Sequence, residues 1–131
     1  MPVTANILVV DDEPDTLGLI ELTLRTAGYH VQTARGGEEA LKKIREESFN
    51  LILLDVMMPG VSGYDVMDRL SVEAIPSPPV IILTAKPRPE DREAGMKRGA
   101  VGFLVKPTKR GDLLDAVAVA LGRAPARHAP A

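Results

Sequence analysis

The stretch 51–54 is the sequence feature that most constrains the fold. It holds four branched apolar residues in a row, is too short for a typical buried helix, and is followed closely by the turn-forming pair Pro59-Gly60. Such a run is typical of a strand buried on both faces. Asp55 follows directly, and a carboxylate buried there without a partner would cost several kcal/mol. We therefore expect Asp55 to meet water, a cation or hydrogen-bond donors.

Short runs of this kind recur along the chain, separated by patterns with helical spacing. We predict five strands, at residues 7–10, 30–34, 51–54, 80–83 and 102–105. The strand at 30–34 alternates polar with apolar residues and should lie at a sheet edge. Five helices are predicted. Four begin at about Pro14, Gly63, Glu90 and Arg110 and end by Gly28, Ile75, Gly99 and Leu121, and one follows the separator Gly36-Gly37 and ends by Ser48. We expect the helix at 90–99 to be mobile, because Gly95 in its interior weakens it.

This alternation of strands and helices predicts an α/β fold, a doubly wound parallel sheet with right-handed crossovers and helices on both faces. With 131 residues, 45% of them hydrophobic, the chain suits one globular domain and is too short for two. We assign residues 1–122 to that domain. Residues 123–131 are rich in alanine and proline, which favours a flexible tail or the stub of a linker.

Composition also bounds the partners and the location. The formal net charge of -2 gives no long-range attraction to nucleic acid or to an anionic membrane. Without cysteine, and with only two histidines, a disulfide framework is excluded and a zinc site is disfavoured. The first residues lack the pattern of a signal peptide, and no apolar stretch approaches the length of a membrane span. We expect a soluble cytoplasmic domain.

Four of the predicted strands deliver polar residues at their carboxyl ends, namely Asp11 with Asp12, Asp55, Thr84 and Lys106. In doubly wound sheets the ligand site lies at this edge, near the point where the strand order reverses. Three carboxylates crowded together repel each other, and Lys106 supplies only one positive charge. Mg²⁺, which takes oxygen ligands and often binds phosphate as well, would supply the rest. Such a set is suited to phosphoryl transfer, with one carboxylate as nucleophile.

Four blocks of sequence carry a specific resemblance, and they occur in order at 9–14 (VVDDEP), 53–63 (LLDVMMPGVSG), 83–86 (LTAK) and 103–107 (FLVKP). Together they resemble the receiver domain of two-component response regulators, chemotaxis regulators among them, over about residues 6–121. The resemblance implies a flavodoxin-like fold with strand order 2-1-3-4-5. It also implies that Asp55 accepts a phosphoryl group from the phosphohistidine of a histidine kinase or phosphotransfer protein.

The resemblance assigns further roles. Asp12, Asp55 and the backbone carbonyl of Met57 would hold Mg²⁺, with Asp11 helping directly or through water. Thr84 and Lys106 would contact the phosphoryl oxygens. The shift of these two residues, with Phe103 as the aromatic switch, would rearrange a face built from the fourth helix, the fifth strand and the fifth helix. The Lys106-Pro107 bond would be cis. Such a domain catalyses only its own phosphorylation and dephosphorylation, and its switched face binds a downstream protein or a second copy.

Other interpretations stay open at this stage. Taken singly, Asp11 and Asp12 suit helix caps, Asp55 and Thr84 suit turns, and Lys106 suits a solvated surface. Phe103 suits plain core. A receiver-like interaction module that is never phosphorylated is the main alternative function. A phosphatase or dehalogenase with an aspartate nucleophile would carry a second aspartate where Met57 stands. A nucleotide-binding module would have a glycine-rich first turn in place of the acidic one.

The last predicted helix, at 110–121, is apolar on more faces than one sheet can cover. It is either an alanine-rich helix with a few exposed methyl groups or a surface for docking or dimerisation.

Overall fold

Five parallel strands form one sheet in the order β2-β1-β3-β4-β5 in the computed structural model, which describes residues 5–85 and 88–122. Their bounds are β1 Asn6–Val10, β2 His30–Ala34, β3 Leu51–Asp55, β4 Val80–Thr84 and β5 Gly102–Val105. The predicted fold class and strand order are confirmed, and β2 lies at a sheet edge as its alternating pattern indicated. Lys86 and the expected tail at 123–131 lie outside the described residues.

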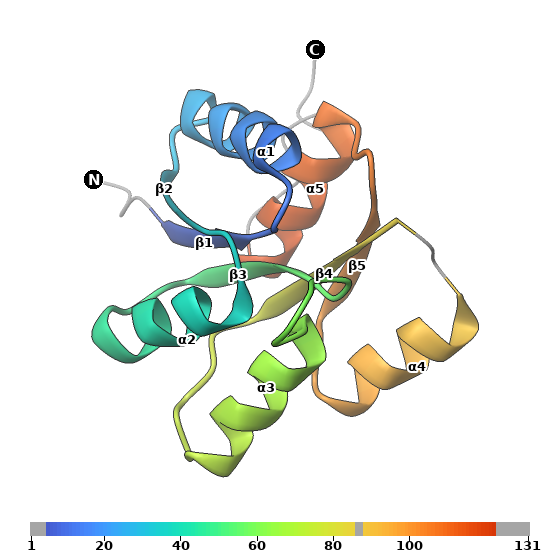
Figure 1. Cartoon of the computed structure of the whole chain (residues 1–131). Helices are drawn as coiled ribbons and strands as arrows, with labels where there is room; N and C mark the ends of the chain where they lie inside the picture. The colour runs from blue at the N-terminus through green and yellow to red at the C-terminus, as the bar shows by residue number, and fades with distance from the viewer. Residues whose placement is uncertain (1–4, 86–87, 123–131) are drawn as a thin grey trace.

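Five helices connect the strands and cover both faces of the sheet (Figure 1). They are α1 Pro14–Thr26, α2 Gly37–Glu46, α3 Gly63–Val72, α4 Pro89–Lys97 and α5 Arg110–Ala120. Helices α1 and α5 pack on one face, and α2, α3 and α4 lie on the other (Figure 1). Every predicted helix is present. Helices α1, α2, α3 and α5 carry apolar residues at the spacing that turns one face toward the sheet, whereas α4 buries only Asp91 and Gly95.

The core consists of two layers, one on each face of the sheet. Every residue of β3 and β4 is buried, which confirms that these unbroken apolar runs are central strands. Alternate strand residues such as Ile7, Leu53 and Ile81 pack against α1 and α5. Their neighbours, such as Leu8, Leu54 and Ile82, pack against α2 and α3. Burying an aliphatic side chain of this size contributes about 1.5–3 kcal/mol, so the two layers hold the sheet rigidly.

The strand order reverses between β1 and β3. The chain leaves β1 for β2 on one side of it and then returns to place β3 on the other side. The first helix, α1, and the two later helices α2 and α3 consequently lie on opposite faces. In doubly wound sheets, ligands bind outside the strand ends at this reversal point. Asp11 and Asp55 stand at these two strand ends.

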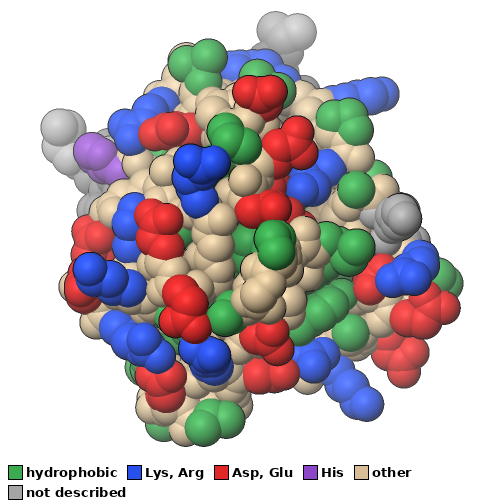
Figure 2. Space-filling model, in the orientation of Figure 1, with side chains coloured by type: hydrophobic (Ala, Val, Ile, Leu, Met, Phe, Trp, Pro, Cys, Tyr) green, Lys and Arg blue, Asp and Glu red, His purple; other side chains and the backbone are tan. Residues whose placement is uncertain are grey.

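Acidic and basic side chains are interspersed over the face of the molecule that Figure 2 shows, with apolar groups between them. This mixed surface agrees with the small net charge of -2. Within residues 5–85 and 88–122, none of the helices has the length and apolar character that crossing a membrane requires.

Candidate functional site

Three carboxylates meet at the carboxyl edge of the sheet. Asp11 follows β1, Asp12 is its neighbour, and Asp55 is the last residue of β3. Each offers one oxygen, and these oxygens all lie within 4.8 Å of one another. Asp11 and Asp55 are 0% and 1% exposed, whereas Asp12 is half-buried. The sequence-predicted cluster is therefore real, and two of its members are inaccessible to bulk water.

Asp11 is held by backbone groups on both of its neighbouring segments. Its amide nitrogen donates to the carbonyl of Ala34 at 3.1 Å, and its Oδ1 accepts from the amide nitrogen of Glu13 at 3.0 Å. The residue at the cap position of α1 is Glu13, and its side chain makes no capping hydrogen bond within the described part of the chain. The interpretation of these acidic residues as helix caps is therefore not needed for Asp11. Its Oδ1 is used by the backbone of Glu13, and its Oδ2 faces the site.

Lys106 joins the two buried carboxylates. Its Nζ donates to Asp11 Oδ2 at 2.9 Å and to Asp55 Oδ2 at 3.0 Å. The other carboxylate oxygen of Asp55, Oδ1, accepts from the amide nitrogen of Met57 at 2.9 Å. Asp55 is thus oriented through both oxygens, one by the loop after β3 and the other by a residue that follows β5.

Burial and charge act in opposite directions on these groups. Desolvation raises the pKa of the Asp55 carboxyl, and the hydrogen bonds from Met57 and Lys106 offset only part of that rise. Desolvation lowers the pKa of Lys106, but its hydrogen bonds to Asp11 and Asp55 outweigh this effect and leave the pKa raised. Lys106 therefore stays protonated, whereas burial disfavours the ionised form of the Asp55 carboxyl.

Thr84 and Lys106 lie next to each other at the same sheet edge. Thr84 is the last residue of β4 and is 1% exposed, and its carbonyl accepts from the amide nitrogen of Lys106 at 2.8 Å. The peptide bond between Lys106 and Pro107 is cis. Phe103 lies further back on β5, opposite Ile82, and packs partly buried on the core layer beneath α3 and α4. Phe103 therefore lies behind the carboxylate edge, two residues before the end of β5.

The donor set fits Mg²⁺. This ion holds oxygen ligands at about 2.1 Å, so two ligands on opposite sides of it lie about 4 Å apart. The three carboxylate oxygens lie within 4.8 Å of one another, and all are hard oxygen donors from Asp11, Asp12 and Asp55. Burial of two of these charges with one lysine leaves an excess of negative charge that a divalent cation would neutralise.

Two glycines near the site were not identified from the sequence as functional. A Cβ on Gly63 would come within 2.5 Å of the carbonyl oxygen of Asp55, and a Cβ on Gly37 would come within 2.5 Å of Val61. The sequence marked Gly37 only as a separator between a strand and a helix. The local signal is the same for every glycine at the start of a helix, so only the packing of distant segments reveals these contacts.

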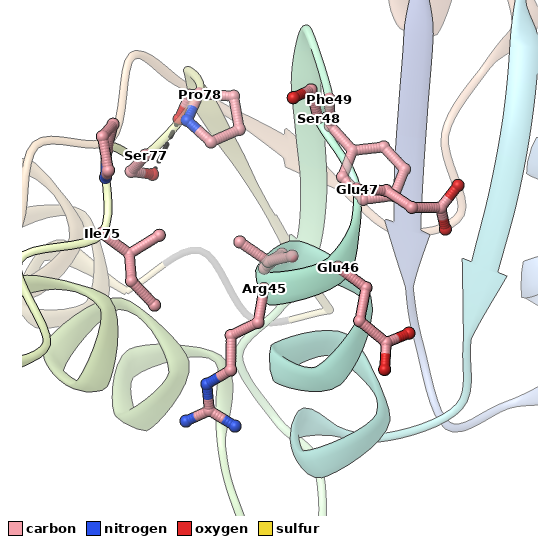
Figure 3. Close-up of a pocket in the computed structure, with 10 residues that line it drawn as sticks. Arg45, Glu46, Glu47, Ser48, Phe49, Ile75, Ser77 and Pro78 are labelled. Carbon is pink, nitrogen blue, oxygen red and sulfur yellow. Dashed lines mark hydrogen bonds between the residues drawn. The ribbon is translucent and has the colours of Figure 1, made fainter.

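A cavity of about 450 Å³ lies at the opposite end of the sheet. Figure 3 shows Phe49, Ile75 and Pro78 on its walls, with Arg45 at the end of α2 beside it. These residues precede β3 and β4, whereas Asp55 and Thr84 end the same two strands. Arg45 is paired with Glu73, and the cavity takes no part in the chemistry of the carboxylate edge.

Comparison with known proteins agrees with this geometry. Residues 7–118 match the response regulator receiver domain family. The chemotaxis response regulator CheY4 of Vibrio cholerae superposes with a TM-score of 0.84 at 34% identity, covering 91% of this chain and 100% of that one.

Two curated relatives are transcriptional regulatory proteins. The alkaline phosphatase synthesis transcriptional regulatory protein PhoP of Bacillus subtilis is 43% identical over 77% of this chain and 42% of its own length. AfsQ1 of Streptomyces coelicolor is 38% identical over 85% of this chain and 48% of its own length. The chain spans less than half the length of both relatives. On the extent of the family match and these identities, the chain belongs to the receiver domains of two-component response regulators.

Proposed function

We propose that this domain receives a phosphoryl group on Asp55 and relays its phosphorylation state to a partner protein. The observation that carries the proposal is the placement of the Asp55 carboxylate at the reversal point of the sheet. There its Oδ2 is 3.0 Å from Lys106 Nζ, and Asp11 shares the same lysine. This arrangement supports a nucleophile that is oriented in advance and surrounded by groups able to neutralise phosphoryl oxygens.

The phosphoryl donor is the phosphohistidine of a histidine kinase or of a phosphotransfer protein. A carboxylate oxygen of Asp55 attacks phosphorus, the new O–P bond forms as the P–N bond breaks, and the donor imidazole keeps the electron pair. Asp11, Asp12, Asp55 and the Met57 carbonyl would hold Mg²⁺, which would supply positive charge for the phosphoryl oxygens. Lys106 moves its hydrogen bond from Asp55 to a phosphoryl oxygen, and Thr84 donates to another.

The output surface in this proposal is the face of α4, β5 and α5. Four exposed apolar side chains support it, Met96, Val101, Val105 and Val119, each at least 45% exposed. A cavity of about 550 Å³ between β5 and α5, lined in part by Phe103 and Val119, lies on the same face. Val101 and Val119 line this cavity together, and exposed apolar groups that share a surface favour a protein partner, either a downstream target or a second copy of the chain.

Two curated relatives are named as transcriptional regulatory proteins, which supports a regulatory downstream event in this proposal. In this proposal the domain catalyses only its own phosphorylation and dephosphorylation, in the cytoplasm. Sedimentation velocity before and after phosphorylation tests whether the partner is a second copy. Self-association gives a sedimentation coefficient that increases with protein concentration, whereas a monomer that binds another target does not.

Acetyl phosphate with Mg²⁺, followed by intact-mass measurement, tests the phosphoacceptor. Wild type should gain the mass of one phosphoryl group, and Asp55→Asn should gain none. Asp15→Asn is the matched control, because Asp15 is exposed in the first turn of α1 and should leave phosphorylation unchanged. An unmodified wild type would favour the alternative function, a receiver-like interaction module that acts without phosphorylation.

A further inference from the structure

The first residue of α2 contacts the loop that follows Asp55. A Cβ built on Gly37 would lie 2.5 Å from Val61 Cγ1, 2.6 Å from the Val61 carbonyl oxygen and 2.7 Å from Val61 Cβ. Real Cβ atoms do not approach other atoms this closely, so a side chain at position 37 requires something to move. Two of these three atoms have no torsional freedom of their own. The adjustment must therefore come from the backbone of the loop or of α2.

Local conformation does not explain the glycine at this position. Gly37 is the N-terminal residue of an α-helix, where its backbone angles are open to any residue. Glycine in a helix is less favourable than alanine by about 1 kcal/mol. The absence of a side chain therefore has its effect outside the helix, in the contact with Val61.

The loop at 56–62 is tied to Asp55 at both of its ends. At the start, the amide nitrogen of Met57 donates to Asp55 Oδ1 at 2.9 Å. At the end, Gly63 packs against the carbonyl oxygen of Asp55, and Ser62 and Asp65 form a reciprocal capping box that begins α3. Val61 lies between these two anchors. Val61 is therefore part of a short loop whose two ends both contact Asp55.

The same junction is attached to the second carboxylate segment. Residue 36 precedes α2, and β2 ends just before it at Ala34. The Ala34 carbonyl accepts from the amide nitrogen of Asp11 at 3.1 Å. The start of α2 thus lies against the loop after β3 on one side and is linked to the Asp11 segment on the other.

We propose that Gly37 is a positioning residue for the acidic site. Its contact with Val61 sets where the loop at 56–62 lies, and this placement fixes the orientation of Asp55 and the geometry of the Mg²⁺ ligands. Gly37 touches neither the phosphoryl group nor the ion. The inference rests on the proposed function only for the identity of the ion.

Titration of Mg²⁺ into purified Gly37→Ala and wild type by calorimetry tests this role, with MgCl2 alone as the probe. Residues that orient metal ligands typically affect affinity by 10-fold or more, so the dissociation constant for Mg²⁺ should rise about 10-fold. Gly36→Ala is the matched control. Gly36 has extended backbone angles, and a Cβ there would meet no atom within 4 Å among the described residues, so Mg²⁺ affinity should equal that of wild type.

Two further measurements separate positioning from general damage to the fold. Val61→Gly removes the side-chain part of the contact at a half-buried position, so it keeps the test available if Gly37→Ala does not fold. It should also weaken Mg²⁺ binding. In phosphorylation by acetyl phosphate, Gly37→Ala should need more Mg²⁺ for half-maximal rate, whereas a purely structural role would lower stability and leave this concentration unchanged.

The inference is overturned if folded Gly37→Ala binds Mg²⁺ as tightly as wild type does. If Gly37→Ala does not fold, wild-type Mg²⁺ affinity in Val61→Gly overturns it instead. Failure of the proposed function has a different signature. In that case wild type itself would not be phosphorylated on Asp55, whatever the affinities of the glycine variants.

Discussion

At the scale of single residues, Lys106 bridges the acidic site. It is the cation shared by two carboxylates that are almost wholly buried, and only 15% of its own side chain is exposed. Removing one partner of a buried ion pair is strongly destabilising, because the remaining charges lose their compensation. The stability of the domain without Mg²⁺ should therefore depend on this lysine.

Lys106→Met should lower the free energy of unfolding in EDTA by roughly 2 kcal/mol, less than the full penalty for a buried pair because the lysine side chain is partly exposed. Urea denaturation followed by circular dichroism measures the change. Lys109→Met is the matched control, since Lys109 is exposed before α5 and should have little effect. Saturating Mg²⁺ should recover part of the loss in Lys106→Met. Equal stability of the two variants in EDTA would contradict the bridging role.

Asp55 should make the stability depend on pH in the sense opposite to a carboxylate whose pKa is lowered on folding, because burial outweighs its salt bridge with Lys106. Burial raises its pKa above the ordinary value of 3.8, so the unfolded state ionises at lower pH than the folded state. As pH rises through this interval, the folded wild type loses stability relative to Asp55→Asn, which cannot ionise. The stability advantage of Asp55→Asn should therefore be larger at about pH 7 than at about pH 3, both measured in EDTA by urea denaturation. A constant difference would refute this.

At the scale of elements, polar contacts tie α3 to α4. Tyr64 on α3 donates its hydroxyl to the carbonyl oxygen of Asp91 on α4 at 3.1 Å, and desolvation raises the Tyr64 pKa. Arg98 lies over the Tyr64 ring at 4.9 Å and pairs with Asp68 at 2.8 Å. These contacts add stability to α4, whose own sequence favours a helix only weakly. The expected mobility of α4 stays a prediction.

Tyr64→Phe should lower the free energy of unfolding by about 1 kcal/mol, the usual net contribution of one hydrogen bond. The variant keeps the ring beneath Arg98, so the change reports the hydroxyl alone. Hydrogen exchange measured by mass spectrometry should show faster exchange in peptides from α4 and unchanged exchange in peptides from α1. Equal exchange in α4 of variant and wild type would mean that this hydroxyl does not hold the helix.

At the scale of the whole molecule, the site links strand ends that are far apart in the sequence. Lys106 is 95 residues from Asp11 and 51 from Asp55, so these contacts exist only in the folded chain. A ligand that binds such a site binds the folded state alone and stabilises it by mass action.

Mg²⁺ should therefore raise the free energy of unfolding by about 2.7 kcal/mol at 100 times its dissociation constant. Thermal unfolding at increasing MgCl2 concentration measures this effect. Asp12→Asn should weaken it, because Asp12 contributes one of the three clustered oxygens. An Asp68→Asn variant, altered on the outer surface of α3, should respond to Mg²⁺ as wild type does. An unfolding temperature that does not change with MgCl2 concentration would refute the metal assignment.

The sequence alone determined the elements and the edge at which the polar residues gather. Unbroken apolar runs at 51–54 and 80–83 identified central strands, and the alternation at 30–34 identified an edge strand, because periodicity reports how many faces of a strand are covered. The polar residues that end these runs followed from the rule that parallel strands end together.

Only the tertiary structure decided which side chains meet. Three sets of contacts join segments that share no local sequence pattern. Lys106 bridges Asp11 and Asp55, Gly37 contacts Val61, and Tyr64 donates to Asp91. Such contacts depend on how helices pack against the sheet and against each other, to within a fraction of an ångström. Periodicity in a sequence encodes which face of an element is buried, but not the distance at which two buried faces come to rest.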